Sequence, residues 1–386
     1  MTENSAADRG RVLLVVSSME FGGAEGQVAM LAERLKARGW AVDVFLLHKT
    51  GTLVEHLERA GVLVDDGGYP PKGSKIRKAI GICLCQARLI RRIWRSRPDI
   101  VHGFLPITSF MSAVAGRLNF VARVIISKRS LAKYQDREPK FKWLDRLANA
   151  LADTVTANSE AVARATEARD GYDASRILVV YNGLDFERLD KARPHREETR
   201  AALSLSGQDI AVGMVANLIP YKGHRELIEA FASVAARDPR LKLFLIGRDD
   251  GIGQTLTESA ARLGVADRVN LMGPRSDVPR LLSAMDIGVL SSHEEGFSNA
   301  LLEKLAAGLP VVATDVGGNP EVLKGMPGCV LVRPQDAGDL ARGLSDAIGG
   351  LGTDDSNRKV RQDLVRERYS VDAMVDAYER MYLRKE

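Results

Sequence analysis

Short segments rich in valine and isoleucine alternate with longer amphipathic segments along the first half of the chain. The short segments fit buried strands, and the longer ones repeat their apolar residues with the period of a helix. Repeated strand–helix–strand units predict a parallel sheet with helices on both faces. The pattern predicts a helix at residues 25–38 and strands at residues 11–17, 41–47, 99–102, 123–127 and 154–157.

The same alternation restarts after residues 179–183 and predicts a second set of strands. We therefore expect an α/β protein with two doubly wound parallel sheets, one in an N-terminal domain at residues 1–185 and one in a C-terminal domain at residues 186–386. The final helix, at about residues 371–386, has no strand after it and can pack back on the N-terminal domain. Because ligands of open α/β sheets bind beyond the carboxyl ends of the strands, we expect the two sheets to face a central cleft. The second set of strands is predicted at residues 210–216, 241–246, 268–272, 287–290 and 311–313.

The composition is that of a globular protein, since 45% of the 386 residues are hydrophobic and 27% are charged. Three cysteines are too few to cross-link a chain of this length, which favours a reducing compartment. The longest apolar runs are far shorter than the roughly 18 to 20 residues that span a bilayer. We therefore expect a cytoplasmic protein.

Positive charge is concentrated in the first half of the chain. Residues 1–190 carry 29 basic and 22 acidic side chains, a net charge of +7, whereas residues 191–386 carry 26 and 28, a net charge of −2. This asymmetry suggests that the first half meets something anionic. The excess is greatest in residues 72–97, which hold nine lysines and arginines and no acidic residue.

Residues 72–97 also carry an apolar stripe. Its members recur at spacings of four and three residues, which is one face of a helix. The stripe can pack the helix on the sheet and leave a solvated basic rim, or the helix can lie on an anionic membrane surface, and both alternatives stay open here. Nucleic acid is not an expected partner, because aromatic residues make up only 5% and no nucleic-acid-binding motif occurs. The stripe consists of Ile76, Ile80, Cys83, Ala87, Ile90 and Trp94.

Several common active-site motifs are absent from the sequence. It contains no G-x-x-x-x-G-K-[ST] phosphate-binding loop and no G-x-S-x-G nucleophile elbow. The glycines after the first predicted strand do not match G-x-G-x-x-G, which disfavours a nicotinamide oxidoreductase. The six histidines form no clustered ligand set, and no D-x-D pair is present to hold a divalent metal as in many sugar transferases. We therefore expect neither a metal nor a bound cofactor.

The segment most indicative of function reads S-S-H-E-E-G-F-S-N-A-L-L-E-K-L-A-A-G-L-P over residues 291–310 and follows a predicted strand. Gly296 permits a tight loop, and Ser298 or Asn299 can cap the helix that follows. The loop amides and the helix N-terminus then favour an anion at one place.

Two glutamates in this segment are eight residues apart. Glu303 would lie about two turns into the helix, where its carboxylate can accept hydrogen bonds from both hydroxyls of a ribose. Glu295 lies at the start of the loop, where it can hold a sugar hydroxyl. As a bare spacing the pair would describe two surface glutamates beside an ordinary helix, but the surrounding segment favours a functional interpretation.

This segment resembles the signature of the retaining glycosyltransferases of family 4, which have the GT-B fold. The resemblance runs from about residue 11 to the end of the chain and is most specific over residues 211–321. Further matching segments are G-L-P-V-V-A-T-D-V-G-G-N-P-E at residues 308–321, F-G-G-A-E at residues 21–25 and N-G-L-D at residues 182–185.

The resemblance implies roles for particular residues. In the family the second glutamate of the signature holds the donor ribose and the first touches the transferred sugar, which correspond to Glu303 and Glu295. Lys222 matches the lysine that neutralises the donor diphosphate, where a cation stabilises the charge that develops as the sugar–phosphate bond breaks. The resemblance also implies that the donor meets the amides of Gly296, Phe297 and Ser298 and is approached from the other domain by Gly22 and Gly23.

The chain departs from the family pattern at two places. Asn217 stands where the family often has an arginine, so that Arg248 or Arg275 could supply the missing cation, or Lys222 carries more of the work. Many members also have a histidine after the fifth strand of the first domain, which this chain lacks. His102, at the end of the preceding strand, is the nearest catalytic candidate, and it could equally be a histidine whose hydrogen bonds are satisfied within the fold.

We therefore expect a retaining, metal-independent glycosyltransferase that uses a nucleotide-diphosphate sugar. The basic N-terminal half suggests a glycan or polyprenyl-diphosphate-linked acceptor in the synthesis of cell-surface polysaccharide or glycolipid. Such an enzyme would work peripherally at the inner face of the cell membrane, in contact with anionic lipid through residues 72–97. The alternatives are a GT-B sugar-nucleotide epimerase and a nucleotide-sugar-binding protein without catalytic activity.

Overall fold

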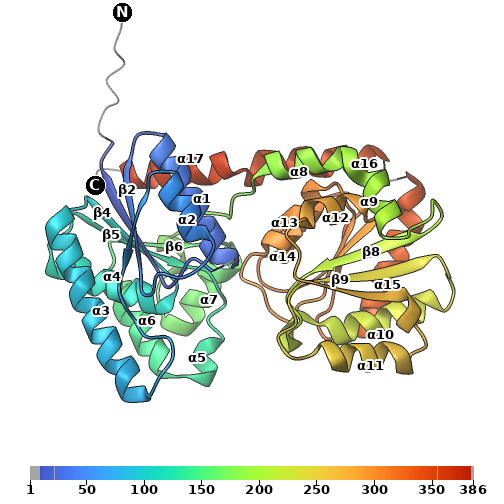
Figure 1. Cartoon of the computed structure of the whole chain (residues 1–386), viewed down its shortest axis with the longest axis horizontal. Coiled ribbons are helices and arrows are strands. Elements are labelled where there is room, and N and C mark those ends of the chain that lie inside the picture. Colours follow the sequence, from blue (N-terminus) through green and yellow to red (C-terminus); the bar gives the residue numbers. More distant parts are fainter. Residues whose placement is uncertain (1–8, 21, 354, 384–386) are drawn as a thin grey trace, which may run out of the picture. The chain divides into compact units, whose positions relative to one another are not determined.

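The computed structural model of the chain describes residues 9–20, 22–353 and 355–383. The chain forms two compact units (Figure 1). Unit 1 contains the residues up to Gly183 and those from Val371 on, and unit 2 contains Leu184–Ser370. The chain therefore passes into unit 2 once and returns to unit 1 for its last helix.

Among the described residues, unit 1 contains a seven-stranded sheet in the order β3-β2-β1-β4-β5-β6-β7. All neighbouring strands pair in parallel, as the repeated strand–helix–strand pattern requires. The strand order reverses between β1 and β4, which are neighbours in the sheet but not in the sequence. The strands are β1 (Arg11–Val16), β2 (Ala41–Leu46), β3 (Leu63–Asp66), β4 (Ile100–Phe104), β5 (Arg123–Lys128), β6 (Thr154–Ala157) and β7 (Ile177–Val179).

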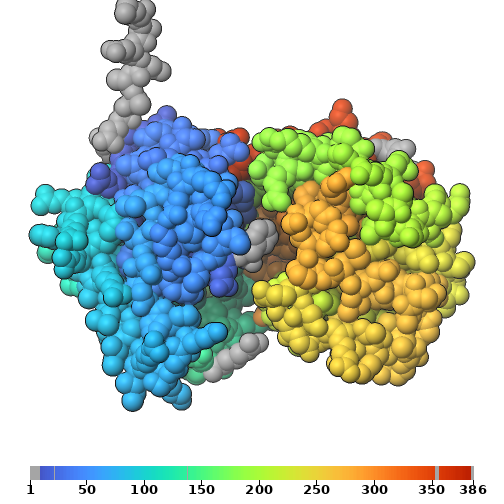
Figure 2. Space-filling view, in the orientation of Figure 1, coloured from blue at the N-terminus to red at the C-terminus, as the bar shows by residue number. Residues whose placement is uncertain are grey.

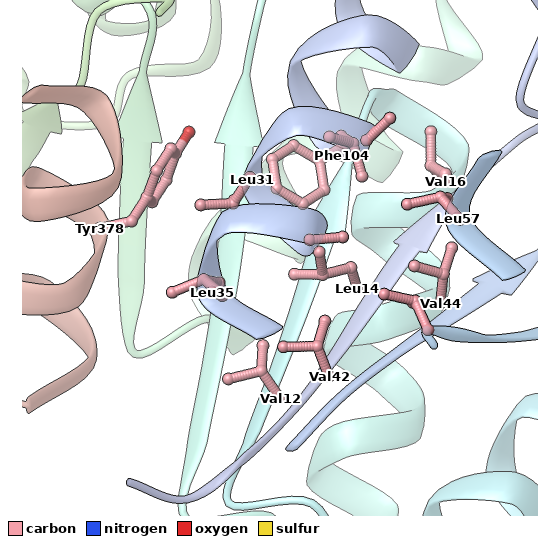
Figure 3. Close-up of a cluster of buried hydrophobic side chains, with 14 of the residues drawn as sticks. Val12, Leu14, Val16, Leu31, Leu35, Val42, Val44, Leu57, Phe104 and Tyr378 are labelled. Carbon is pink, nitrogen blue, oxygen red and sulfur yellow. The ribbon is translucent and has the colours of Figure 1, made fainter. Parts of the chain in front are cut away.

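Helices cover both faces of this sheet. They are α1 (Gly23–Ala37), α2 (Leu53–Arg59), α3 (Lys75–Ser96), α4 (Pro106–Leu118), α5 (Tyr134–Arg137), α6 (Lys140–Leu151), α7 (Glu160–Asp170) and α17 (Val371–Leu383). Side chains alternate along β1, so Val12 and Leu14 pack with α1, α2 and α17, whereas Leu13 and Val15 pack with α3, α4 and α7. Figure 3 shows the first of these clusters, in which Tyr378 of α17 lies beside the side chains of α1.

Unit 2 contains, among the described residues, a six-stranded parallel sheet in the order β10-β9-β8-β11-β12-β13. Here the order reverses between β8 and β11. Its strands are β8 (Ile210–Val215), β9 (Leu241–Ile246), β10 (Val269–Gly273), β11 (Ile287–Leu290), β12 (Val311–Thr314) and β13 (Val330–Val332). Its helices are α8 (Phe186–Ala192), α9 (Arg196–Ala202), α10 (His224–Ala235), α11 (Gly253–Arg262), α12 (Val278–Ala284), α13 (Asn299–Ala306), α14 (Asn319–Leu323), α15 (Ala337–Gly350) and α16 (Asp355–Tyr369).

The two doubly wound parallel sheets confirm the predicted fold class. Every strand that the sequence pattern predicted is present, but the pattern missed β3, β7 and β13. All three are edge strands of their sheets. An edge strand has one neighbour and is less fully buried, so it does not need a long apolar run. In β3, for example, Leu63 is exposed and the strand ends in Asp65 and Asp66.

The orientation of α3 shows that one interpretation of its apolar stripe is wrong, namely that the stripe packs the helix on the sheet. The helix packs on the sheet through Cys85, Leu89 and Ile93, whereas most of the predicted stripe faces solvent. Arg92 fixes this orientation, since it donates to Asp65 and Asp43 on the neighbouring strands at 2.5 and 2.7 Å. Among the described residues, no helix combines the length and the apolar character needed to cross a bilayer.

Candidate functional site

Lys222 and Glu295 come from the loops that follow β8 and β11. These strands are the neighbours at which the strand order of unit 2 reverses. The connections on either side of such a point lead away in opposite directions, so the two loops leave room for a ligand beyond the carboxyl ends of the strands. Lys222 ends a short 3₁₀ turn (η3, Pro220–Lys222), and Glu295 lies four residues before α13.

The two side chains form a short ion pair. Lys222 Nζ lies 2.6 Å from Glu295 Oε1, and the hydroxyl of Ser292 donates to the same oxygen at 2.7 Å. The side chains are only 19% and 11% exposed, so water screens the pair less than an ion pair on the open surface. A preorganised cation and a carboxylate therefore meet at the point where the fold favours ligand binding.

Backbone contacts tie the two loops together. The hydroxyl of Ser291 donates to the carbonyl oxygens of Lys222 and Gly223 at 3.1 and 2.9 Å. The amide of His293 donates to the carbonyl oxygen of Tyr221 at 2.7 Å. Gly223 has φ +72°, and a Cβ there would overlap the carbonyl oxygen of Ser291. Only glycine allows this approach without strain, so the position of Lys222 depends on its neighbour.

The loop after β12 supports the Glu295 loop from its other side. The hydroxyl of Thr314 donates to the carbonyl oxygen of Ser292 at 2.6 Å. The amide of Gly318 donates to the carbonyl oxygen of Gly296 at 3.0 Å. Gly317 has φ +54°, and a Cβ there would overlap the carbonyl oxygen of Glu295. The G-G pair after β12 therefore holds the Glu295 loop in place.

Helix α13 begins directly after this loop. Ser298 is its N-cap and accepts a hydrogen bond from the amide of Leu301 at 3.3 Å, which selects Ser298 from the two predicted caps. The ring of Phe297 is buried against Tyr369, with 5.5 Å between the ring centroids, so any role of Phe297 toward a ligand would use its backbone. The N-terminal amides of α13 favour an anion at the loop.

Glu303 is half-buried in the second turn of α13. Burial raises the pKa of its carboxyl group, while the positive charges of Lys304 and Arg188 lower it. Among the described residues no donor is hydrogen-bonded to this carboxylate, so its oxygens can accept from a ligand.

Lys304 is a buried cation that the sequence interpretation missed. Its side chain is fully buried against Gly288 of β11, and its Nζ donates to the carbonyl oxygen of Ala300 at 3.1 Å. Burial lowers the pKa of Lys304 to about 8, Glu303 and Glu295 raise it, and Lys222 lowers it. The available signal was a lysine within the apolar run A-L-L-E-K-L-A-A, where a solvent-facing position is not expected.

The candidate substitutes for the missing arginine are engaged elsewhere. Arg248 and Arg275 each form an ion pair with the aspartate two residues later, at 2.7 and 2.6 Å. Asn217 is exposed, and its Oδ1 accepts from the amide of Arg248 at 3.3 Å, which places these two residues beside one another. Arg275 follows the edge strand β10, so it lies further from the β8–β11 junction.

Gly22 and Gly23 lie in unit 1, at the turn from β1 into α1. Both are exposed, and the carbonyl oxygen of Gly22 accepts from the amide of Gly26 at 3.0 Å. The turn follows one of the two strands between which the order of the first sheet reverses. Phe21, which belongs to the same predicted loop, is outside the described residues.

His102 is a correction to the predicted catalytic set. Its side chain is fully buried, and its ring nitrogens are bonded to the hydroxyls of Tyr382 and Ser127 at 2.7 and 2.8 Å. Burial, together with the charge of Arg129, holds its pKa well below the usual value. A neutral imidazole with both nitrogens engaged links β4 to α17 and is not available to a substrate.

The residues at the end of β5, where the family histidine is missing, are polar and engaged. Lys128 is buried and its Nζ lies 2.9 Å from Asp145 and 3.5 Å from Asp170. The guanidinium of Arg129 donates to Asn182 at 2.6 Å. A small pocket at the ends of β4 and β5 is lined by Lys128, Arg129 and Asp170, so charged side chains of both signs line it in place of a histidine.

Two family profiles match most of the chain between them. The family described as "Glycosyltransferase Family 4" matches residues 21–188, and that described as "Glycosyl transferases group 1" matches residues 209–349. The first match lies almost entirely in unit 1 and the second lies in unit 2.

Curated relatives agree with these profiles. A D-inositol 3-phosphate glycosyltransferase of Geodermatophilus obscurus is 29% identical, in an alignment that covers 93% of this chain and 85% of the relative. The enzyme of the same name from Salinispora arenicola is 32% identical, over 59% of this chain and 54% of the relative.

Solved structures show the same fold. Anabaena Alr3699/HepE in complex with UDP superposes with a TM-score of 0.84 at 23% identity and covers 96% of this chain and 99% of its own. Its complex with UDP-glucose gives a TM-score of 0.82 at the same identity and coverage. These matches confirm the expected GT-B fold.

Proposed function

Because this chain belongs to glycosyltransferase family 4, and is a nucleotide-sugar-dependent transferase of that family, we propose that it transfers a sugar from a UDP-sugar to a lipid-linked glycan acceptor with retention of configuration. Uridine as the base is supported by the UDP and UDP-glucose complexes of Anabaena Alr3699/HepE, which has the same fold. In this proposal unit 2 binds the donor and unit 1 binds the acceptor.

The observation that carries the donor half is the 2.6 Å pair of Lys222 and Glu295 at the β8–β11 junction. We assign the ammonium of Lys222 to the donor diphosphate and the carboxylate of Glu295 to the hydroxyls of the transferred sugar. Diphosphate would compete with Glu295 for Lys222, so donor binding exchanges an internal ion pair for contacts with both parts of the donor.

The remaining donor contacts come from the Glu295 loop and α13. The amides of Gly296, Phe297 and Ser298 lie at the N-terminal end of that helix and would donate hydrogen bonds to phosphate oxygens. Glu303 would accept from the ribose hydroxyls. Asn217 follows β8, the neighbour of β11, and would complete the phosphate side together with Arg248, which follows β9.

The reaction that these groups support breaks the bond between the anomeric carbon and the diphosphate oxygen. The bonding electrons leave with the diphosphate, where Lys222 and the amides stabilise the charge. The acceptor hydroxyl then attacks the anomeric carbon from the same face and gives its proton to the departing diphosphate oxygen. No motif places a carboxylate as the nucleophile of a double displacement, and the proposal requires no metal.

For the acceptor we propose a glycan linked to polyprenyl diphosphate, used in the synthesis of cell-surface polysaccharide or glycolipid. The net charge of +7 in residues 1–190 and the basic face of α3 support an anionic partner for unit 1. The enzyme would then work at the inner face of the cell membrane and touch anionic lipid through residues 72–97.

Release of UDP tests this function against its alternatives. The full-length protein is incubated with UDP-glucose or another UDP-sugar, with and without polyprenyl-diphosphate-linked saccharide, and UDP is measured. A transferase releases UDP only when the acceptor is present. An epimerase converts the donor without an acceptor, and a binding protein does neither. D-inositol 3-phosphate is a second acceptor to test, because it appears in the name of the curated relatives.

A further inference from the structure

Helix α3 presents a row of large apolar side chains to solvent. Ile76, Ile80, Leu84 and Trp94 are 73%, 56%, 54% and 67% exposed. Isolated exposed apolar residues are ordinary, but four large ones on a single helix form a patch that calls for a partner. In Figure 1 helix α3 lies beside the sheet of unit 1, and in Figure 2 its residues lie at the surface.

The four side chains form a continuous stripe. Ile76 and Trp94 are 18 residues apart, which is five turns of an α-helix, so they project from the same side about 27 Å apart. Ile80 and Leu84 follow Ile76 at intervals of four residues, and the small exposed side chains of Cys83 and Ala87 fill the space between them and Trp94. The stripe therefore extends along most of the helix.

The stripe cannot be buried by a simple rotation of the helix. The opposite face already holds Cys85, Leu89 and Ile93 in the core of unit 1. Gly81 packs so closely on Pro70 that a Cβ would overlap its ring, and Arg92 is held by two aspartates of the sheet. Turning the outward face inward would break all of these contacts.

Arginines flank the stripe on one side. Arg77, Arg91 and Arg95 project beside it and form no ion pair within the described part of the chain, whereas Arg88 donates to the carbonyl oxygen of Gly67 at 2.6 Å. Asp65 and Asp66, which line a shallow pocket together with Arg91 and Arg95, are engaged by other groups. Asp65 binds Arg92 at 2.5 Å, and Asp66 accepts from two backbone amides.

From these contacts we propose that the outward stripe of α3 inserts into an anionic lipid bilayer, with Arg77, Arg91 and Arg95 on the lipid headgroups. Apolar side chains that enter the interface, flanked by cations, are the features that bind an amphipathic helix parallel to a membrane. Trp94 is suited to the interfacial region by its amphipathic ring.

Charge complementarity selects lipid over the other occupants of an apolar face. A second copy of the chain would bring the same arginines opposite these ones, so repulsion opposes self-association. A flat lipid surface matches a straight stripe about 27 Å long and supplies negative charge along all of it. This inference rests on the acceptor half of the proposed function and replaces general contact through residues 72–97 with insertion of one defined face.

Flotation of the full-length protein with vesicles tests the inference. We expect co-flotation with vesicles of phosphatidylcholine and phosphatidylglycerol at a 7:3 ratio and little with phosphatidylcholine alone. The double variant Ile80→Glu/Leu84→Glu places two acids in the stripe and should abolish flotation. Leu263→Glu/Leu271→Glu, at exposed apolar positions of unit 2, is the matched control and should float like the parent.

A second measurement separates insertion from electrostatic adsorption. Arg91→Gln/Arg95→Gln should weaken partitioning by on the order of tenfold. In the Trp143→Phe background, Trp94 is the exposed tryptophan, because Trp40 is buried, and its emission should shift to shorter wavelength on anionic vesicles. Insertion is overturned if Ile80→Glu/Leu84→Glu floats like the parent, if Trp94 emission does not shift, or if the parent is a dimer that this variant makes monomeric. The assay uses neither donor nor acceptor, so failure would leave the donor assignment intact.

Discussion

Lys222 and Glu295 form an ion pair of 2.6 Å although 73 residues separate them in the chain. The pair exists because the two strands that lead to them are neighbours at the point of reversal in the second sheet. The carboxylate of Glu295 contacts the same lysine that we assign to diphosphate. We infer that the site keeps both charges satisfied until a donor supplies partners for each.

We expect Glu303→Gln to weaken UDP binding by about tenfold, because an amide is a poorer acceptor for the two ribose hydroxyls than a carboxylate. Binding of inorganic diphosphate, which has no ribose, should be unchanged. Isothermal titration calorimetry with UDP and with diphosphate measures the two affinities. If Glu303→Gln weakens the binding of both ligands equally, Glu303 does not bind the ribose.

Two glycines with the same backbone conformation form a matched pair for stability. Gly223 and Gly264 both have φ +72°, but a Cβ on Gly264 meets no neighbour, whereas one on Gly223 would overlap Ser291. We expect Gly264→Ala to lower the free energy of unfolding by about 1–2 kcal/mol, the cost of the left-handed conformation. Gly223→Ala should cost more and should also weaken UDP binding. Urea unfolding measures both free energies. If the two variants lose similar amounts, the atoms around Gly223 move aside for the new Cβ without further cost.

The central strands of both sheets could be predicted from sequence, because a strand buried on two faces needs an uninterrupted apolar run. The edge strands β3, β7 and β13 could not, since each has only three or four residues, and β3 ends in two aspartates. Helix α3 shows a second limit. Both of its faces carry apolar residues, and periodicity alone does not say which face meets the sheet; Arg92 and Gly81 decide it through contacts between distant segments.

The candidate site could likewise be predicted only in part from the sequence. The resemblance to family 4 drew attention to Lys222, Glu295 and Glu303, but spacing alone could not have brought a lysine 73 residues away to Glu295. The burial of Lys304 and the close approach of Gly317 depend on how the loops and α13 pack, so no local pattern records them. His102 looked available because it ends a short predicted strand, whereas α17, from the far end of the chain, covers it.

Replacing Lys304 by methionine should stabilise the protein at pH 7. Burial lowers the pKa of Lys304 to about 8, from about 10.4 in the unfolded chain. Its burial penalty is therefore full below pH 8, falls between pH 8 and pH 10, and is absent above. We expect Lys304→Met to raise the free energy of unfolding by about 2 kcal/mol at pH 7, with the gain shrinking toward pH 10.

Urea unfolding of both proteins from pH 7 to pH 10 measures this gain. Lys324→Met, which changes an exposed lysine, is the control and should show no such pH dependence. A Lys304→Met protein that is less stable at pH 7 would mean that the attraction of Lys304 to the charges of Glu303 and Glu295 outweighs the cost of its burial.

Two buried histidines predict a loss of stability in mild acid. Burial lowers the pKa of His224 to about 4 and holds that of His102 well below its usual value. Below about pH 6.5 the unfolded chain binds protons at these positions and the folded chain does not. The free energy of unfolding therefore decreases as the pH is lowered, by up to about 1.4 kcal/mol per pH unit for each histidine. Urea unfolding between pH 7.5 and pH 5 should show this slope.

Variants assign the slope to the buried histidines. His102→Asn should reduce it by about half, and His56→Gln, at an exposed position, should leave it unchanged. A flat profile in the parent would show that the folded chain takes up protons at these sites as readily as the unfolded chain does.

Calorimetric titration of UDP into the parent protein and Lys222→Ala tests the donor site most directly. Charge-assisted contacts to phosphate should make UDP bind at least about tenfold more weakly to the variant. Lys324→Ala, which removes an exposed lysine from the same unit, should bind UDP like the parent. Equal affinity of the parent and Lys222→Ala would contradict the account, because the diphosphate would then lie away from the Lys222–Glu295 pair.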